Sequence, residues 1–220
     1  MELTGKVINF LGDSITEGAG VADPDNIYVS RLARMLELGA ANNYGIGGTR
    51  IARQQNRSET ERYDQDFCLR CVDMDPSASV NVIMGGTNDF GHGDAPIGTP
   101  DDRTPDTFWG ACHFLMSTLI TKYPGAVNVI CTPLHRLNEA VPTGDRKPAP
   151  VGTLKEYVDI IRTVAEYYSL PVCDLYAISG LQPRVPAIQE RYVPDGLHPN
   201  DDGHAILADR IAGFLRAMME

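Results

Sequence analysis

Short apolar runs alternate with longer helical patterns along most of this chain. Runs of strand length lie at residues 7–11, 79–84, 127–132 and 171–175, and a more polar run follows the first of them at residues 40–46. Apolar residues recur with helical spacing at residues 27–38, 107–122, 153–168 and 201–219. Such alternation is typical of a parallel sheet covered by helices. We therefore expect an α/β fold, a three-layer α/β/α sandwich with a five-stranded parallel sheet.

The length of 220 residues suits one domain, spanning residues 1–220, with a full hydrophobic core. The net charge of −10 argues against nucleic acid and anionic membranes as partners, because both are bound through lysine and arginine. No segment approaches eighteen consecutive apolar residues, and the start, MELTGKVINF, lacks the features of a secretory signal. We expect a cytoplasmic protein that acts on a small molecule, and the formation of a homo-oligomer is left open.

The cysteines predict little chemistry. They are an odd number in apolar or helical surroundings, as is typical of reduced thiols in a core: Cys68, Cys71, Cys112, Cys131 and Cys173. Only Cys68 and Cys71 form a CxxC motif, and its spacing suits one face of a helix rather than the strand-to-helix junction of a thioredoxin-like site. Two cysteines also supply only half of a four-cysteine zinc site.

Four polar stretches converge on one edge of the predicted sheet. GDSIT, NYGIGGTR and GGTNDF follow the first three predicted strands, and PDGLHPN precedes the last helix. Ligands of open parallel sheets bind beyond the carboxyl ends of the strands, so these stretches should face one crevice. They would bring together Ser14, the glycines at 45, 47 and 48, Asn88, Asp195 and His198.

This set of side chains suits acyl transfer. A serine hydroxyl becomes a nucleophile when a base takes its proton, and a carboxylate must orient that base and stabilise the imidazolium. Ser14 can be the nucleophile, His198 the base and Asp195 the orienting acid. The developing oxyanion needs preorganised donors, which the backbone N–H groups of Ser14 and of the glycine turn can supply together with the Asn88 amide.

In order and spacing, these stretches resemble the four sequence blocks of the SGNH hydrolases, also called the GDSL esterase and lipase superfamily. GDSITEG, the glycine turn, GGTND and DGLHPN cover nearly the whole chain, and one block departs slightly, with GDSI in place of GDSL. The resemblance implies a flavodoxin-like fold and an ester hydrolase with a triad of Ser14, Asp195 and His198. It also implies that no metal or cofactor takes part.

The resemblance further implies the oxyanion donors. They would be the backbone N–H of Ser14, the Asn88 amide and a glycine of the turn after the second strand. We choose Gly48 over Gly47, because the catalytic glycine of the superfamily usually lies five residues after an asparagine, here Asn43.

Two long loops, at residues 90–106 and 135–152, should overhang the same edge of the sheet. They carry His92 and His135, which we expect to contact substrate, with Asp13 beside the nucleophile as a further substrate contact that also braces its loop. The loops are polar and offer hydrogen bonds rather than an apolar slot. This favours a small acyl ester, acetyl above all, borne by a carbohydrate. A lysophospholipid or short-chain thioester is the alternative, since the superfamily spans these substrates.

Other interpretations of the same residues stay open from sequence. Ser14 could serve only as the N-cap of a helix. A metal site is a rival at His198, since Asp201, Asp202 and His204 crowd near it, although both aspartates suit a helix N-terminus. A nucleotide-binding module is disfavoured, because GIGGTR ends in an arginine where the phosphate-binding pattern needs glycine. A sugar-binding module with a vestigial site is the remaining non-enzyme alternative.

Overall fold

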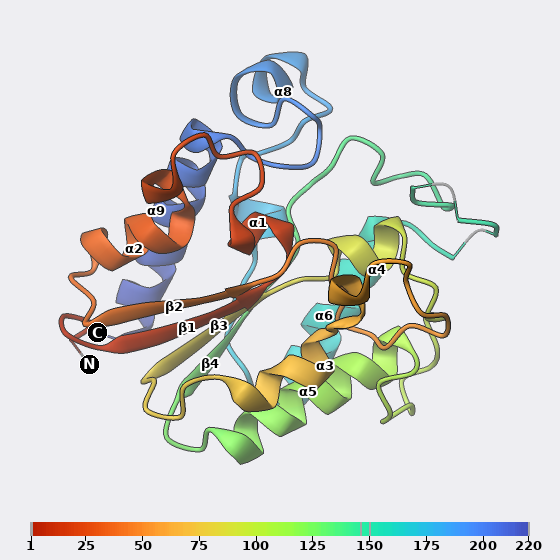
Figure 1. Ribbon diagram of the computed structural model, residues 1–220, viewed down its shortest axis with the longest axis horizontal. Helices are drawn as coiled ribbons and strands as arrows, with labels where there is room; N and C mark the ends of the chain where they lie inside the picture. Colours follow the sequence, from red (N-terminus) through yellow and green to blue (C-terminus); the bar gives the residue numbers. More distant parts are fainter. Residues whose placement is uncertain (1, 146, 150, 220) are drawn as a thin grey trace.

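A five-stranded, all-parallel sheet organises the chain in the computed structural model, which describes residues 2–145, 147–149 and 151–219 (Figure 1). The strands are β1 (Val7–Gly12), β2 (Ala40–Gly45), β3 (Val80–Met84), β4 (Val127–Cys131) and β5 (Val172–Cys173), in the spatial order β2-β1-β3-β4-β5. The predicted three-layer α/β/α fold is confirmed. The last strand is shorter than the predicted run at 171–175, because the chain turns at Asp174 and a helix begins at Leu175.

The helices differ widely in length. They are α1 (Ser14–Glu17), α2 (Tyr28–Met35), α3 (Phe67–Arg70), α4 (Thr87–Gly91), α5 (Phe108–Lys122), α6 (Leu154–Tyr167), α7 (Leu175–Ile178), α8 (Pro186–Tyr192) and α9 (Asp201–Met219), with 3-10 turns η1 (Pro24–Asn26), η2 (Glu61–Asp64) and η3 (Cys71–Asp73). None of these described helices has both the length and the apolar composition needed to cross a bilayer.

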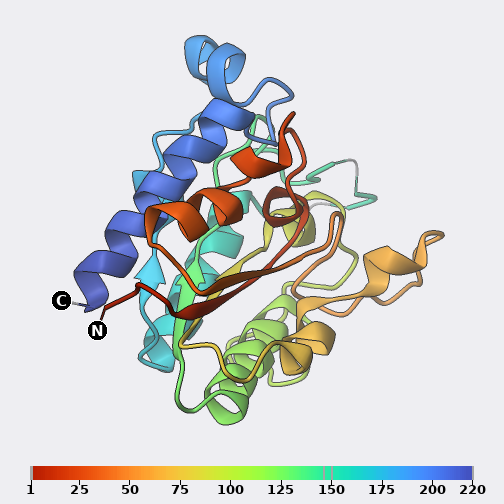
Figure 2. The same ribbon diagram turned by 60° about the vertical axis from the view of Figure 1, so that its left-hand side comes forward.

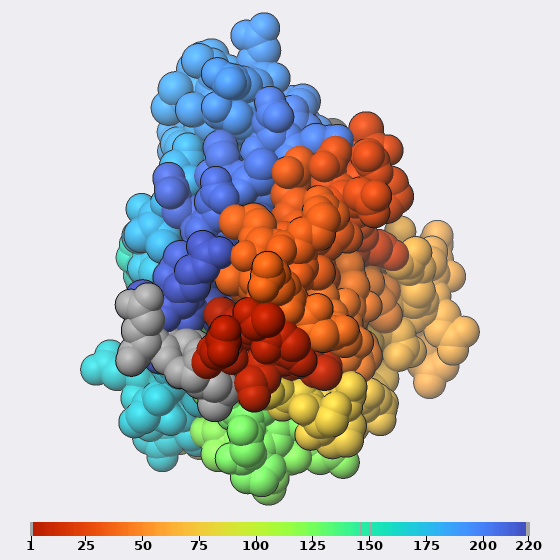
Figure 3. All heavy atoms as spheres, turned by 90° about the vertical axis from the view of Figure 1, so that its left-hand side faces the viewer, coloured from red at the N-terminus to blue at the C-terminus, as the bar shows by residue number. Residues whose placement is uncertain are grey.

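The long helices cover the two faces of the sheet (Figure 2). On one face, α2 and α9 pack against Ile8, Phe10 and Val82, and Figure 3 shows the C-terminal helix lying against the N-terminal part of the chain. On the other face, α3, α5 and α6 pack against Leu11 and Ile83. Side chains of a strand alternate between the two faces of the sheet, so each strand contributes side chains to the hydrophobic core on either face.

A row of four asparagines crosses the sheet. Asn42, Asn9, Asn81 and Asn128 are register partners on β2, β1, β3 and β4. Each side-chain amide donates to the next carbonyl oxygen, with N–O distances of 3.0 Å from Asn42 to Asn9, 2.8 Å from Asn9 to Asn81 and 2.8 Å from Asn81 to Asn128. The row satisfies polar groups that are otherwise costly to bury.

Local signals explain where the long helices begin. The Thr107 hydroxyl accepts from the Gly110 N–H at the start of α5, and Thr153 forms a capping box with Glu156 at the start of α6. The Asn200 side chain accepts from the Gly203 N–H at the start of α9. These caps satisfy N–H groups that the helices leave without internal partners.

The strand order also fixes where a site can form. The chain runs outward from β1 to β2, then returns past β1 to continue with β3, β4 and β5. The carboxyl ends of β1 and β3 therefore lie side by side at a topological switch point, where open sheets of this kind bind ligands.

Candidate active site

Ser14 lies at the first position of α1, directly beyond β1. The strand ends at Gly12, where a Cβ would lie 1.9 Å from Oγ1 of Thr16, so only glycine lets the helix begin this close to the strand. The Asp13 carboxylate accepts from the Ile15 N–H at 3.1 Å and caps the short helix. The turn therefore holds Ser14 at the edge of the sheet.

The Ser14 hydroxyl is hydrogen-bonded to the imidazole of His198, whose other ring nitrogen is hydrogen-bonded to the Asp195 carboxylate. Oγ of Ser14 lies 3.0 Å from Nε2 of His198, and Nδ1 of His198 lies 2.7 Å from Oδ2 of Asp195. A carboxylate accepts only, so Nδ1 carries a proton toward Asp195 and Nε2 is left to accept from Ser14. This is the geometry by which a base activates a serine.

The loop that carries Asp195 and His198 is fixed by the same carboxylate. Oδ1 of Asp195 accepts from the backbone N–H of Leu197 at 2.8 Å and of His198 at 2.7 Å. Partial burial favours the neutral carboxyl, but these hydrogen bonds and the His198 ring together hold the pKa of Asp195 below its usual value. Asp195 thus stays ionised and fixes both the conformation of this loop and the orientation of the His198 ring.

Two backbone N–H groups near Ser14 are available to a substrate oxygen. Within the described residues, no hydrogen bond occupies the N–H of Ser14 or of Gly48. The neighbouring Gly47 N–H instead donates to Oε2 of Glu17 at 2.8 Å. Gly48 has φ +78°, and a Cβ there would lie 2.7 Å from Cδ1 of Tyr63, so the turn requires glycine.

The Asn88 amide is a third donor, and its orientation is fixed. Asn88 follows β3 in α4, and its Nδ2 donates to the Thr49 carbonyl at 2.9 Å. Oδ1 of Asn88 lies 3.2 Å from Nε2 of His92, which must then carry the proton of that bond. No other described residue accepts from Nδ2, so its second hydrogen remains for a ligand in the pocket that Asn88 lines.

Five of the residues predicted from sequence line one open pocket of about 340 Å³. They are Ser14, Gly48, Asn88, His92 and His198, with Asp195 behind the His198 ring. The ring of His92 is exposed at this pocket, and partial enclosure together with nearby Arg50 lowers its pKa, which favours the neutral imidazole.

The other two predicted substrate contacts lie outside this pocket lining. Asp13 is only 2% exposed, and its carboxylate is turned onto the Ile15 N–H. Burial raises the pKa of Asp13 to about 6, against the opposing effects of that N–H and of His198. His135 bonds Oε2 of Glu139 at 2.7 Å and packs on Tyr176. Asp13 braces its loop, as expected, and His135 is held by Glu139, so neither side chain lies in the lining of this pocket.

The pocket also contains residues that sequence analysis missed. They are Glu17, Ala19, Arg62, Tyr63, Asp145 and Leu197, and they lie beside Gly47, which was expected there. Glu17 lies within GDSITEG and could have been noticed there, since one carboxylate oxygen holds Gly47 and the other pairs with Arg62. Arg62 and Tyr63 come from the segment between β2 and α3, whose path over the site no local pattern predicts.

Asp145 comes from the long loop at 135–152, of which residues 146 and 150 lie outside the described part. Its carboxylate accepts two hydrogen bonds from Nη2 of the buried Arg136, at 2.6 and 2.7 Å. Nη1 of Arg136 donates to the Thr87 carbonyl at 3.1 Å, which ties the loop to the helix that carries Asn88. The predicted overhang of this loop therefore reaches the pocket at Asp145.

The rival sites from sequence have other contacts in the structure. The Asp201 carboxylate accepts from the Ala22 N–H at 2.7 Å and from Asn26, and Nδ1 of His204 accepts from the Tyr28 N–H at 3.0 Å. Across residues 2–145, 147–149 and 151–219, no group of three metal-ligating side chains is found. The thiols of Cys68 and Cys71 are buried, and burial raises their pKa values.

Comparison with known proteins places the chain among esterases and lipases. A family model described as the GDSL-like lipase/acylhydrolase family matches residues 10–206. One solved structure is 33% identical, with 99% of each chain covered and a TM-score of 0.84. A protein from Lactobacillus plantarum is 27% identical, with 97% of this chain and 98% of that chain covered and a TM-score of 0.82.

A more distant solved structure is that of a carbohydrate acetylesterase family member from Sinorhizobium meliloti. It is 17% identical, covers 97% of this chain and 98% of its own, and has a TM-score of 0.64, so it shares the fold. A comparison with curated proteins finds no match.

Proposed function

The chain belongs to the GDSL-like lipase/acylhydrolase family and is a carboxylic ester hydrolase, and we propose that Ser14, His198 and Asp195 are its catalytic triad. We propose further that it removes short acyl groups, acetyl above all, from carbohydrate. The observation that carries the first proposal is the unbroken chain of hydrogen bonds from Oγ of Ser14 through His198 to Asp195, with distances of 3.0 and 2.7 Å.

The proposed reaction has two halves. Oγ of Ser14 attacks the ester carbonyl carbon while Nε2 of His198 takes the hydroxyl proton, and that proton then goes to the leaving alcohol oxygen. A water molecule, deprotonated by His198, next attacks the carbonyl carbon of acyl-Ser14. The bond from that carbon to Oγ then breaks, His198 returns the proton to Oγ, and the carboxylic acid leaves. In both halves, the N–H groups of Ser14 and Gly48 and the Asn88 amide would stabilise the oxyanion.

The pocket lining supports a short acyl group. Among the described residues that line it, the aliphatic side chains are Ala19 and Leu197, while Glu17, Arg62 and Asp145 add charge. A long lipid chain would have to lie against these polar groups and lose the benefit of burial. The same fold also carries a carbohydrate acetylesterase family member, which is consistent with a sugar-borne ester.

The test of the triad is Ser14→Ala, measured with 4-nitrophenyl acetate. We expect kcat/KM to fall by about 10⁴ or more while the circular dichroism spectrum is unchanged. Ser77→Ala is the matched control, since Ser77 is exposed and lies before β3, at the opposite edge of the sheet. Full activity of Ser14→Ala would refute the proposal.

The acyl preference is tested with a graded series of 4-nitrophenyl esters, followed by acetylated sugars. We expect kcat/KM to be highest for acetate and to fall with each longer chain. A preference for long acyl chains would favour the alternative lysophospholipase. Hydrolysis of thioesters in preference to matched oxygen esters would favour the alternative thioesterase, and sugar binding without any hydrolysis would favour a binding module.

A further inference from the structure

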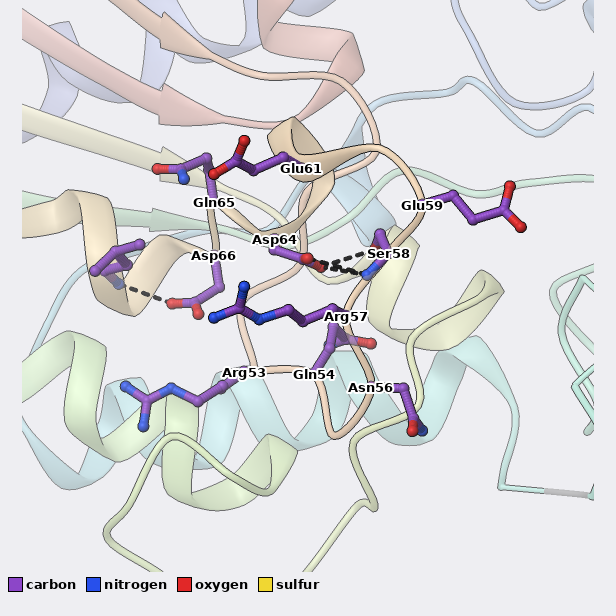
Figure 4. A pocket seen from close by; sticks show the side chains of 11 residues that line it. Arg53, Gln54, Asn56, Arg57, Ser58, Glu59, Glu61, Asp64, Gln65 and Asp66 are labelled. Atoms are coloured by element: carbon purple, nitrogen blue, oxygen red, sulfur yellow. Dashed lines mark hydrogen bonds between the residues drawn. The ribbon is translucent and has the colours of Figure 1, made fainter.

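The active-site pocket adjoins a longer groove. It shares Gly48, Tyr63 and His92 with a neighbouring cavity of about 500 Å³. That cavity in turn shares Gln54, Asn56, Arg57 and Ser58 with a third cavity of about 590 Å³ (Figure 4). We call these two outer cavities, lined by residues of the segment 48–69 with His92 and Asp94, the lateral groove.

The segment that lines the groove is held in place by two carboxylates. Asp94 accepts from the backbone N–H groups of Gln55 at 2.7 Å and Asn56 at 2.9 Å. Asp64 accepts from the Ser58 backbone N–H and hydroxyl, the latter at 2.7 Å, as the dashed lines in Figure 4 show. The groove is thus a built surface with its own hydrogen-bond network.

Tyr63 stands where the active-site pocket meets the groove. It lines both, its ring packs on Gly48, and it is 39% exposed. A tyrosine ring combines an apolar face with a polar tip. A sugar ring presents a face of C–H groups and a rim of hydroxyls, so it can stack on such a ring while its ester reaches Ser14.

Farther along the groove, polar side chains remain free to bind. In the part of the chain that the structure describes, no hydrogen bond or ion pair occupies the side chains of Arg57, Glu61 or Gln65. In Figure 4 the Arg57 side chain extends across the outer cavity. These groups offer both donors and acceptors, which is the mixture that sugar hydroxyls require.

The charge of the groove argues against an anionic ligand. Three arginines line the two outer cavities, and five carboxylates line them as well. A phosphate-bearing or polyanionic leaving group would meet repulsion along most of this path. Cavities of this volume hold ligands of more than a few atoms, so the groove has room for sugar units beyond the one that carries the ester.

We propose that the lateral groove binds the remaining sugar units of a neutral, O-acetylated oligosaccharide, with Tyr63 stacking on the unit next to the scissile ester and Arg57 and Gln65 bonding units farther along. This rests on the proposed ester hydrolysis at Ser14. The enzyme should therefore prefer acetylated oligosaccharides to acetylated monosaccharides.

The kinetic test compares 4-nitrophenyl acetate with O-acetylated mono-, di- and tetrasaccharides of xylose and of mannose. For the wild type, we expect kcat/KM to rise by about tenfold or more from mono- to tetrasaccharide in at least one series. Tyr63→Ala and Arg57→Ala should each lower the ratio of tetrasaccharide to 4-nitrophenyl acetate kcat/KM by about fivefold or more. Tyr63→Phe should keep the ratio, because the ring is retained.

Tyr167→Ala is the matched control, since Tyr167 is an exposed tyrosine on α6 outside the groove. No gain with chain length in either series would overturn the groove proposal while leaving ester hydrolysis intact. A loss in Tyr63→Ala that is equal on both substrates would also overturn it, because it would report a general disturbance of the Gly48 turn. Absent hydrolysis of every ester would instead overturn the proposed function.

A binding measurement separates the groove from catalysis. Ser14→Ala is titrated with unacetylated tetrasaccharides of xylose and mannose in a calorimeter. We expect the Ser14→Ala variant to bind at least one tetrasaccharide. The double variant Ser14→Ala/Tyr63→Ala should bind it clearly more weakly or not at all. Binding that is unchanged by Tyr63→Ala, or no binding of either tetrasaccharide, would count against the groove.

Discussion

Nε2 of His92 lies 3.2 Å from Oδ1 of Asn88, so one pocket residue orients the amide of another. Without this bond, only the hydrogen bond from Nδ2 to the Thr49 carbonyl would hold the Asn88 amide in this orientation. A less firmly held amide would be a poorer donor to the oxyanion that we propose it stabilises. We therefore expect His92 to act through Asn88, as a positioning residue.

Replacing His92 by Ala should lower kcat on 4-nitrophenyl acetate by about tenfold and leave KM within about twofold. His92→Gln should recover most of the loss, because its amide can still donate to Oδ1 of Asn88. His135→Ala is the companion variant, and kinetics close to wild type are expected from its place beside Glu139. A rise in KM with unchanged kcat in His92→Ala would show that His92 contacts substrate directly.

Asp195→Asn tests how the His198 tautomer is set. The amide would donate to Nδ1, which would move the ring proton to Nε2 and leave no acceptor for the Ser14 hydroxyl. We expect kcat to fall by about 10³ to 10⁴ with the fold intact. Asp202→Asn, at an exposed acid on the first turn of α9, should retain wild-type kinetics. A loss of less than tenfold in Asp195→Asn would argue against its role in the triad.

The buried His204 should make stability depend on pH. Burial lowers its pKa from 6.5 to about 4, so the unfolded chain binds a proton there at pH values where the folded chain does not. The contribution of this site to stability is fully present above pH 6.5 and is lost as the pH falls toward 4. Between pH 7.5 and 5.0 the loss should be about 2 kcal/mol.

The measurement is urea unfolding of the wild type and of His204→Asn at these two pH values. The Asn carbonyl can still accept from the Tyr28 N–H, as Nδ1 of His204 does. Asp13 and Asp89, whose pKa values burial raises to about 6, favour the folded state as the pH falls, but they do so equally in both proteins. The wild type should lose more stability than the variant, and equal losses would contradict the assignment.

The asparagine row should contribute strongly to stability at its centre and weakly at its end. Asn81→Ala removes two side-chain hydrogen bonds and leaves Asn9 and Asn128 with unpaired buried groups, so the free energy of unfolding should fall by about 2–4 kcal/mol. Asn42→Ala removes one bond of the row, the one to Oδ1 of Asn9. Because residue 42 is only partly buried, water can enter there and donate to that oxygen, so the cost should be about 1 kcal/mol or less. Similar losses in the two variants would disprove this ranking.

Much of the fold was predictable because its signals are local. The strands β1 to β4 and the helices α2, α5, α6 and α9 follow from apolar runs and helical spacing, and their ends differ from prediction by a few residues at most. The short helices α7 and α8 were not predicted, since one or two turns carry too little periodicity. The asparagine row was also missed, although VINFL, VNVIM and VNVIC each place an asparagine near the strand start.

The candidate site divides in the same way. Ser14, Asn88 and His198 follow strands or precede a helix, so the topology alone brings them to one edge of the sheet. Tyr63, Arg62 and Asp145 reach the pocket through loops whose paths depend on contacts such as that of Arg136 with Asp145. Such contacts leave no periodic mark in the sequence, and the three residues could be found only from the structure.

The asparagine row has a consequence for how the chain folds. If β3 or β4 were displaced by one residue, its asparagine would lie opposite valine, isoleucine or phenylalanine, and several polar groups would be left unpaired at once. Parallel strands pair slowly, because each closure joins segments far apart in sequence, and wrong pairings must come apart before the right one forms. By destabilising mispaired sheets, the row would make them short-lived and would favour the correct strand register during folding.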